Sequence, residues 1–154
     1  MLAGELHSFA VHFAVGLLLA SVPCDVLGLL LHREALLVAG KWMTLAGALG
    51  VALAAATGLL AQQSLGAHSA AGEALLHLHR ALGFVVAVPW VPLALWRLFA
   101  KAALPLRLRT FYLSFVFAGV AVLVFETGLG TTLVYQYGLG LSAAARAEPL
   151  APQR

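Results

Sequence analysis

The stretch HSFAVHFAVGLLLASVPCDVLGLLL, residues His7–Leu31, decides the fold of this 154-residue chain. It is long enough to cross a bilayer, because a spanning helix needs roughly 20 mostly apolar residues. It nevertheless carries His7 and His12 near its start and Asp25 further along. Ionisable side chains inside a spanning helix are costly and usually have a functional reason. These three residues are therefore the first candidates for a functional site.

The composition of the whole chain supports a membrane location. Hydrophobic residues make up 62% of the sequence and charged residues 10%, and the mean hydropathy is +0.98. Too little polar surface remains to cover a water-soluble globule. The net charge of +3 does not indicate nucleic-acid binding, because the basic residues fall in short connections between apolar runs rather than along one face.

Four apolar runs pass the length test, at about residues 8–31, 42–62, 76–99 and 110–135. We expect an all-α integral membrane domain over residues 1–141, built as a four-helix transmembrane bundle, with a short external tail at 142–154. The acidic start MLAGELHSF lacks the basic region of a signal peptide, so the first helix is expected to be retained. Ala and Gly dominate the second run, which predicts a closely packed helix.

The distribution of Lys and Arg predicts the orientation. Six of the nine basic residues flank the first and third connections, which must lie on one side of a four-helix protein: Arg33, Lys41, Arg97, Lys101, Arg107 and Arg109. By the positive-inside rule this side is cytoplasmic, so both termini lie outside. The expected location is the cytoplasmic (inner) membrane of a bacterium, with several spans.

Four of the six histidines then fall at a similar depth near the outer face: His7 and His12 on the first helix, and His77 and His79 on the third. His77 and His79 are about 200° apart around a helix, so they cannot both face one site. We therefore expect a site formed by one histidine from each helix. Their depth in the membrane does not determine which two histidines form it.

Glycine spacing favours His12 and His79, because Gly16 and Gly83 follow them by one turn and would let a porphyrin lie against each helix. We therefore predict a non-covalent haem b with His12 and His79 as the axial ligands of its iron. His7 and His77 remain the alternative ligands. Arg80, with His68 or His7, is expected near the haem propionates at the water boundary.

Other interpretations of these residues stay open. Histidines at a membrane interface are often hydrogen-bonded or solvated without a ligand, and a Zn or Cu site would use the same side chains. Asp25 is expected to act as an interhelical hydrogen-bond acceptor or a helix-end cap. Glu126, in the outer half of the fourth helix, is nearer the histidines, so a role with quinone or in proton transfer is conceivable.

Two stretches resemble the small prokaryotic membrane proteins of domain-of-unknown-function family 2231. The first helix resembles that family's HPxxVHFPIALL opening, and TGLGTTLVYQYGLGL at residues 127–141 is similar to its GxLGGELVYRHGVG ending. The matching residues are His7, His12, Phe13, Asp25, Leu133, Val134, Tyr135, Gly138 and Gly140. Ser8 and Ala14 replace the family prolines, Thr132 its glutamate and Tyr137 its histidine. The resemblance implies a four-helix architecture like that of cytochrome b membrane subunits.

These observations favour a membrane-embedded b-type cytochrome subunit. It would hold one haem near the outer face and pass electrons between a periplasmic donor, such as a c-type cytochrome, and quinone or other membrane subunits of a larger complex. A cofactor-free structural or assembly subunit is the alternative. An electron-transfer subunit is favoured over a free-standing enzyme.

Overall fold

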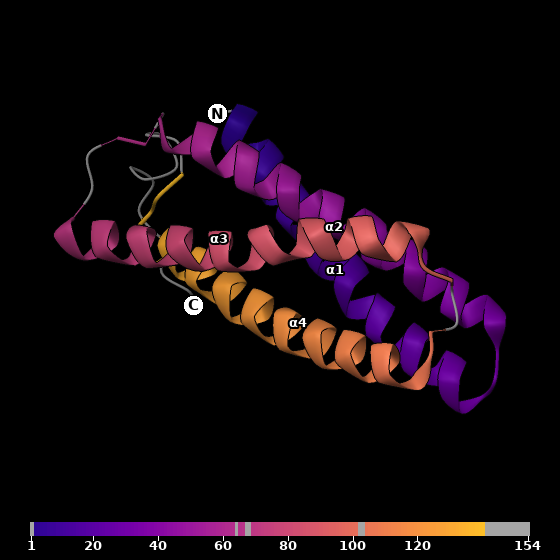
Figure 1. The fold of residues 1–154 in the computed structure, drawn as a ribbon. Helices are drawn as coiled ribbons and strands as arrows, with labels where there is room; N and C mark the ends of the chain where they lie inside the picture. Colours follow the sequence, from indigo (N-terminus) through magenta and orange to yellow (C-terminus); the bar gives the residue numbers. More distant parts are fainter. Residues whose placement is uncertain (1, 64, 67–68, 102–103, 141–154) are drawn as a thin grey trace, which may run out of the picture.

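Four antiparallel helices form the protein in a computed structural model that describes residues 2–63, 65–66, 69–101 and 104–140. They are α1 (Leu2–Leu30), α2 (Glu34–Gln62), α3 (Ala70–Phe99) and α4 (Leu106–Tyr135). Figure 1 shows the start of α1 and the end of α4 at one end of the bundle, with the α1–α2 and α3–α4 connections at the other. All four helices are long and apolar enough to cross a membrane. The expected all-α transmembrane bundle is confirmed, whereas residue 68 and the tail at 142–154 lie outside the described residues.

The ends of the helices agree with the predicted ends, but every helix begins earlier than predicted, at residues 2, 34, 70 and 106. The first turns carry charged side chains that lower local hydropathy without interrupting the backbone hydrogen bonds. Lys41 shows how such a residue is accommodated on α2. Its Nζ donates to the carbonyl oxygens of Leu98 and Ala100, at 3.0 and 2.7 Å, and so satisfies carbonyls at the end of α3.

The α1–α2 pair is the most closely packed part of the bundle. Cβ atoms added at Gly47 and Gly50 would lie 2.6 Å from Leu18 Cγ and 3.0 Å from Ala14 Cβ. Small residues at these points let the two backbones approach, which is how membrane helices gain packing contacts without a hydrophobic driving force. The predicted close packing of the second helix is confirmed.

The remaining helices complete a ring in which α3 contacts α2 and α4, and α4 also contacts α1. The helices α1 and α3 are therefore diagonal to each other. The central core includes Leu18 and Trp90, both fully buried, and Val116. Large apolar side chains such as Phe9, Phe99 and Phe111 are exposed on the outside, where lipid would cover them.

Candidate histidine site

His7 points from the first turns of α1 into the bundle. Its Nδ1 lies 2.8 Å from the carbonyl oxygen of Ala54 on α2. A carbonyl oxygen can only accept, so Nδ1 carries the proton and donates it. In the neutral ring Nε2 is then the unprotonated nitrogen, with a lone pair available to a ligand.

His79 is held in the same way from α3. Its Nδ1 lies 2.9 Å from Glu126 Oε1 and 3.3 Å from the Glu126 carbonyl oxygen on α4. The two side chains are mostly enclosed, with 14% of His79 and 9% of Glu126 exposed. When Nδ1 donates to the carboxylate, Nε2 is again the nitrogen left for a ligand.

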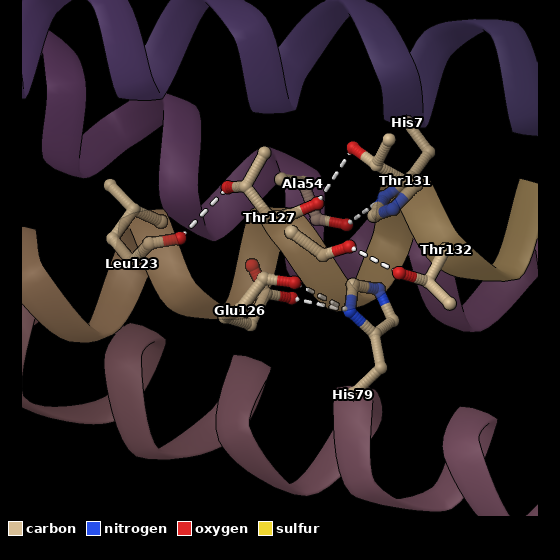
Figure 2. A network of polar contacts seen from close by, with 9 residues as sticks. His7, Ala54, His79, Leu123, Glu126, Thr127, Thr131 and Thr132 are labelled. Atoms are coloured by element: carbon tan, nitrogen blue, oxygen red, sulfur yellow. Dashed lines mark hydrogen bonds and ion pairs between the residues drawn. The ribbon is translucent and has the colours of Figure 1, made fainter.

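The two rings meet across the diagonal of the bundle. Their centroids are 6.3 Å apart and their planes are inclined by 85°. Figure 2 shows both rings in the space between α1 and α3, each with Nδ1 bonded to its anchor on α2 or α4. We call His7, His79 and Glu126 the histidine cluster.

Two glycines lie directly against these rings. A Cβ at Gly58 would lie 3.0 Å from both Nδ1 and Cε1 of His7, and a Cβ at Gly130 would lie 3.1 Å from Cε1 of His79. The rings therefore occupy the space that side chains at these two positions would need. A larger residue at either position would therefore displace the ring.

The part of α4 behind the rings is rich in threonine, but these hydroxyls are satisfied within their own helix. Thr127, Thr131 and Thr132 donate to the carbonyl oxygens four residues earlier, at 2.8 to 3.0 Å. Such back-bonding leaves the hydroxyl proton engaged and tends to bend a helix slightly. No bond between these hydroxyls and the histidine rings is found in the described part of the chain.

The other predicted site residues lie outside this cluster. His12 is exposed, about 140° around α1 from His7, and its Nδ1 lies 2.7 Å from the Ser8 carbonyl oxygen. His77 is also exposed. Its Nε2 lies 2.9 Å from Glu73 Oε1, and its Nδ1 is 3.0 Å from a guanidinium nitrogen of Arg80. The structure thus brings His79 together with His7, the alternative partner.

The two glycines used in the sequence argument have different surroundings. Gly16 is exposed, and a Cβ there would meet nothing within 4 Å. A Cβ at Gly83 would lie 3.5 Å from Glu126 Oε1, in ordinary contact with the histidine cluster. Gly58 and Gly130, which do touch the rings, were not predicted. Gly130 follows Glu126 by one helical turn, and this spacing was the available signal.

A second polar cluster lies at the opposite end of the bundle. The Tyr112 hydroxyl donates to Asp25 Oδ2 at 2.7 Å and accepts from Thr44 Oγ1 at 3.0 Å. The Arg97 guanidinium lies over the Tyr112 ring, 5.1 Å from its centroid, and Nη1 donates to the Lys101 carbonyl oxygen at 2.7 Å. The expected role of Asp25 as an interhelical acceptor is confirmed. We call Asp25, Thr44, Arg97 and Tyr112 the tyrosine cluster.

A Zn or Cu site is not supported by the side chains at hand. Within the described ranges, no three His, Cys, Asp or Glu side chains gather closely enough to hold a metal ion. The histidine cluster offers two imidazole nitrogens, fewer than the four ligands of a tetrahedral metal site.

Comparison with known proteins identifies the family. A family model described as "Predicted membrane protein (DUF2231)" matches residues 4–143, which include both polar clusters and all of the four helices except the first two residues of α1. No curated protein and no solved structure matches the chain. The chain therefore belongs to the DUF2231 family of predicted membrane proteins.

Proposed function

We propose that this protein is a membrane-embedded electron-transfer subunit that holds one b-type haem between His7 and His79. The observation that carries the proposal is the arrangement of the two rings. The rings come from diagonal helices, and their centroids lie 6.3 Å apart. In each ring, Nδ1 donates a hydrogen bond to an oxygen of the protein. Histidines that bind metals almost always donate their other ring N–H to a carbonyl or carboxylate, which fixes the ring and raises its basicity.

The donor chemistry of the site fits a haem. His7 and His79 would hold its iron through two neutral imidazole nitrogens, and the haem would supply one-electron chemistry at a potential set by ligands and surroundings. His7 therefore takes the place of His12 in the proposal, since the exposed His12 ring faces away from the bundle. Arg80 is exposed and remains the cation proposed for the propionates.

The proposed electron path runs between a periplasmic donor, such as a c-type cytochrome, and quinone or neighbouring membrane subunits. The proposed location is the bacterial cytoplasmic membrane with both chain ends outside. Support comes from six basic residues near the α1–α2 and α3–α4 connections.

The orientation can be tested by thiol labelling, because Gln63 and Lys101 are exposed at opposite ends of the bundle. In a Cys24→Ala background, Gln63→Cys should react with an impermeant thiol reagent on whole cells and Lys101→Cys should not; the reverse pattern would invert the topology.

The test of the haem proposal is a reduced-minus-oxidised spectrum of the purified protein. The wild type is expected to show the Soret and α bands of low-spin haem b. His7→Ala and His79→Ala should each lose this signal, because each removes one axial ligand. His12→Ala and His77→Ala are matched controls that should keep it. Loss of the signal in His12→Ala with retention in His7→Ala would restore the ligand pair first predicted from the glycine spacing.

The second candidate is a cofactor-free structural or assembly subunit. One observation favours it: neither of the two described hollows is lined by His7 or His79, and the rings pack against Gly58 and Gly130. In that case the histidine cluster would serve only to tie the four helices together. A purified wild-type protein without haem bands, from cells supplied with a haem precursor, would select this candidate.

A further inference from the structure

A groove opens between the end of α1 and the start of α4, at the end of the bundle that holds the tyrosine cluster. Figure 1 shows these two helix segments at the same end of the bundle as the α1–α2 and α3–α4 connections. Its volume is about 700 Å³, within the range of small-molecule sites. Among the four adjacent helix pairs, α1 and α4 make the least extensive contact. The groove thus lies where the bundle is least closed.

The lining of this groove, which we call the α1–α4 groove, is amphipathic. Its apolar part is formed by Val26, Leu29, Leu30, Leu113 and Phe117, and its polar part by His32, Arg109, Thr110 and Ser114. The polar residues His32 and Arg109 lie at the helix ends, close to the membrane boundary, while Phe117 lies about two turns deeper along α4. A ligand for this groove needs a polar head and an apolar body.

Three of the four polar side chains of the groove make no bond to the part of the chain that the structure describes. Within the described ranges, no side-chain hydrogen bond or ion pair involves Arg109, His32 or Ser114, whereas Thr110 Oγ1 donates to the Leu106 carbonyl oxygen at 3.1 Å. His32 is also the one non-glycine residue of the described chain with a positive φ, 53°. This left-handed backbone at the end of α1 carries the ring to the rim of the groove.

The nearest buried acid is already engaged elsewhere. Asp25 lines a small adjoining hollow together with Arg109, but its carboxylate accepts the Tyr112 hydrogen bond and has the Arg97 guanidinium in its field. The Arg109 guanidinium therefore remains available to an external anion. Guanidinium groups bind phosphates strongly because they present parallel N–H donors.

We propose that the α1–α4 groove binds an anionic phospholipid, with the phosphate at Arg109 and His32 and one acyl chain along the apolar lining. Basic pockets between membrane helices are suited to anionic headgroups, and each basic side chain adds to the affinity. A free phosphate would leave the apolar lining unused, and a neutral quinone head would not need the guanidinium. This proposal is independent of the haem.

The experiment uses the purified full-length protein in detergent, titrated with dioleoyl phosphatidylglycerol or dioleoyl phosphatidylcholine and read by native mass spectrometry. The wild type is expected to prefer phosphatidylglycerol. Arg109→Gln should weaken its binding about fivefold, in line with the contribution of one basic residue to anionic-lipid binding. Arg107→Gln is the matched control, because Arg107 lies two residues earlier on α4, is exposed and does not line the groove.

A second variant tests the apolar part of the site. Ser114 is exposed at the groove, so Ser114→Phe should fill it, with loss of phosphatidylglycerol binding but unchanged helicity and elution volume. Equal weakening in Arg109→Gln and Arg107→Gln would overturn the proposal, since it would show a general charge effect. Tight binding of decylubiquinone that displaces phosphatidylglycerol and is insensitive to Arg109→Gln would also overturn it.

Discussion

The two polar clusters of this protein lie in the same bundle, yet their side chains are held in different ways. In the tyrosine cluster, hydrogen bonds and a cation–π contact join side chains from all four helices, and the residues are at most 2% exposed. In the histidine cluster, each ring is anchored through Nδ1, and Nε2 has no hydrogen bond to any residue that the structure describes. A ligand could therefore interact with one nitrogen of each ring.

Both clusters pack against glycines. A Cβ at Gly40 would lie 2.8 Å from the Asp25 carboxyl carbon, so the tyrosine cluster is packed against the α2 backbone. At the histidine cluster, Cβ atoms at Gly58 and Gly130 would lie 3.0 and 3.1 Å from the His7 and His79 rings. We infer that the tyrosine cluster stabilises the bundle and that the histidine cluster is the site of function.

The largest expected effect comes from breaking the tyrosine cluster. Asp25→Leu removes the acceptor of the Tyr112 hydroxyl and puts an apolar side chain among the buried Thr44, Arg97 and Tyr112 side chains. A buried polar group that loses its partner costs about 1 to 3 kcal/mol, and more where the group is charged. The free energy of unfolding in mixed micelles should fall by that amount. Glu126→Leu, on the histidine cluster, should cost less, and equal costs would remove the distinction between the clusters.

A smaller effect is expected for the Tyr112 hydroxyl alone. Tyr112→Phe keeps the ring under Arg97 but removes the bonds to Asp25 and Thr44. Hydrogen bonds between membrane helices contribute about 1 to 2 kcal/mol at most, so the loss of unfolding free energy should be of that order. Tyr135→Phe is the control, because Tyr135 is 83% exposed and should show no change.

The smallest effect on stability, and the most informative for the histidine cluster, comes from a pair of glycines on α4. Gly128→Ala meets nothing within 4 Å and should stabilise the helix by about 0.5 to 1 kcal/mol. Gly130→Ala would bring a methyl group to 3.1 Å from Cε1 of His79, so the ring would have to shift. Only Gly130→Ala should broaden or abolish the haem spectrum. Identical spectra in both variants would mean that the ring position does not matter for ligation.

Most of the fold follows from hydropathy, and the error in the helix starts has one cause. A helix predicted from an apolar run stops where charged residues begin, whereas the actual helix continues as long as its backbone hydrogen bonds are made. Glu34 and Lys41 at the start of α2 were excluded for that reason. The contacts of Lys41 with the end of α3 depend on tertiary packing, which hydropathy does not describe.

The sequence predicted the depth of the histidines in the membrane but not which of them point into the bundle. His7 and Asp25 are 18 residues apart, about five helical turns, and therefore share a face of α1; His79 and Arg97 share a face of α3 by the same spacing. Because a buried ionisable residue must face the bundle, these partners could have selected His7 over His12. The acceptors Ala54 and Glu126 could not be assigned in this way, since they depend on the relative rotation of neighbouring helices.

The amount of haem b per polypeptide in the purified protein tests whether a single haem lies between His7 and His79, as we propose. We predict about one haem per chain in the wild type, most of it lost in His7→Ala and in His79→Ala, and nearly all retained in His12→Ala. A value close to two, or a value that is unchanged when both His7 and His79 are replaced, would rule out a single haem between these two histidines.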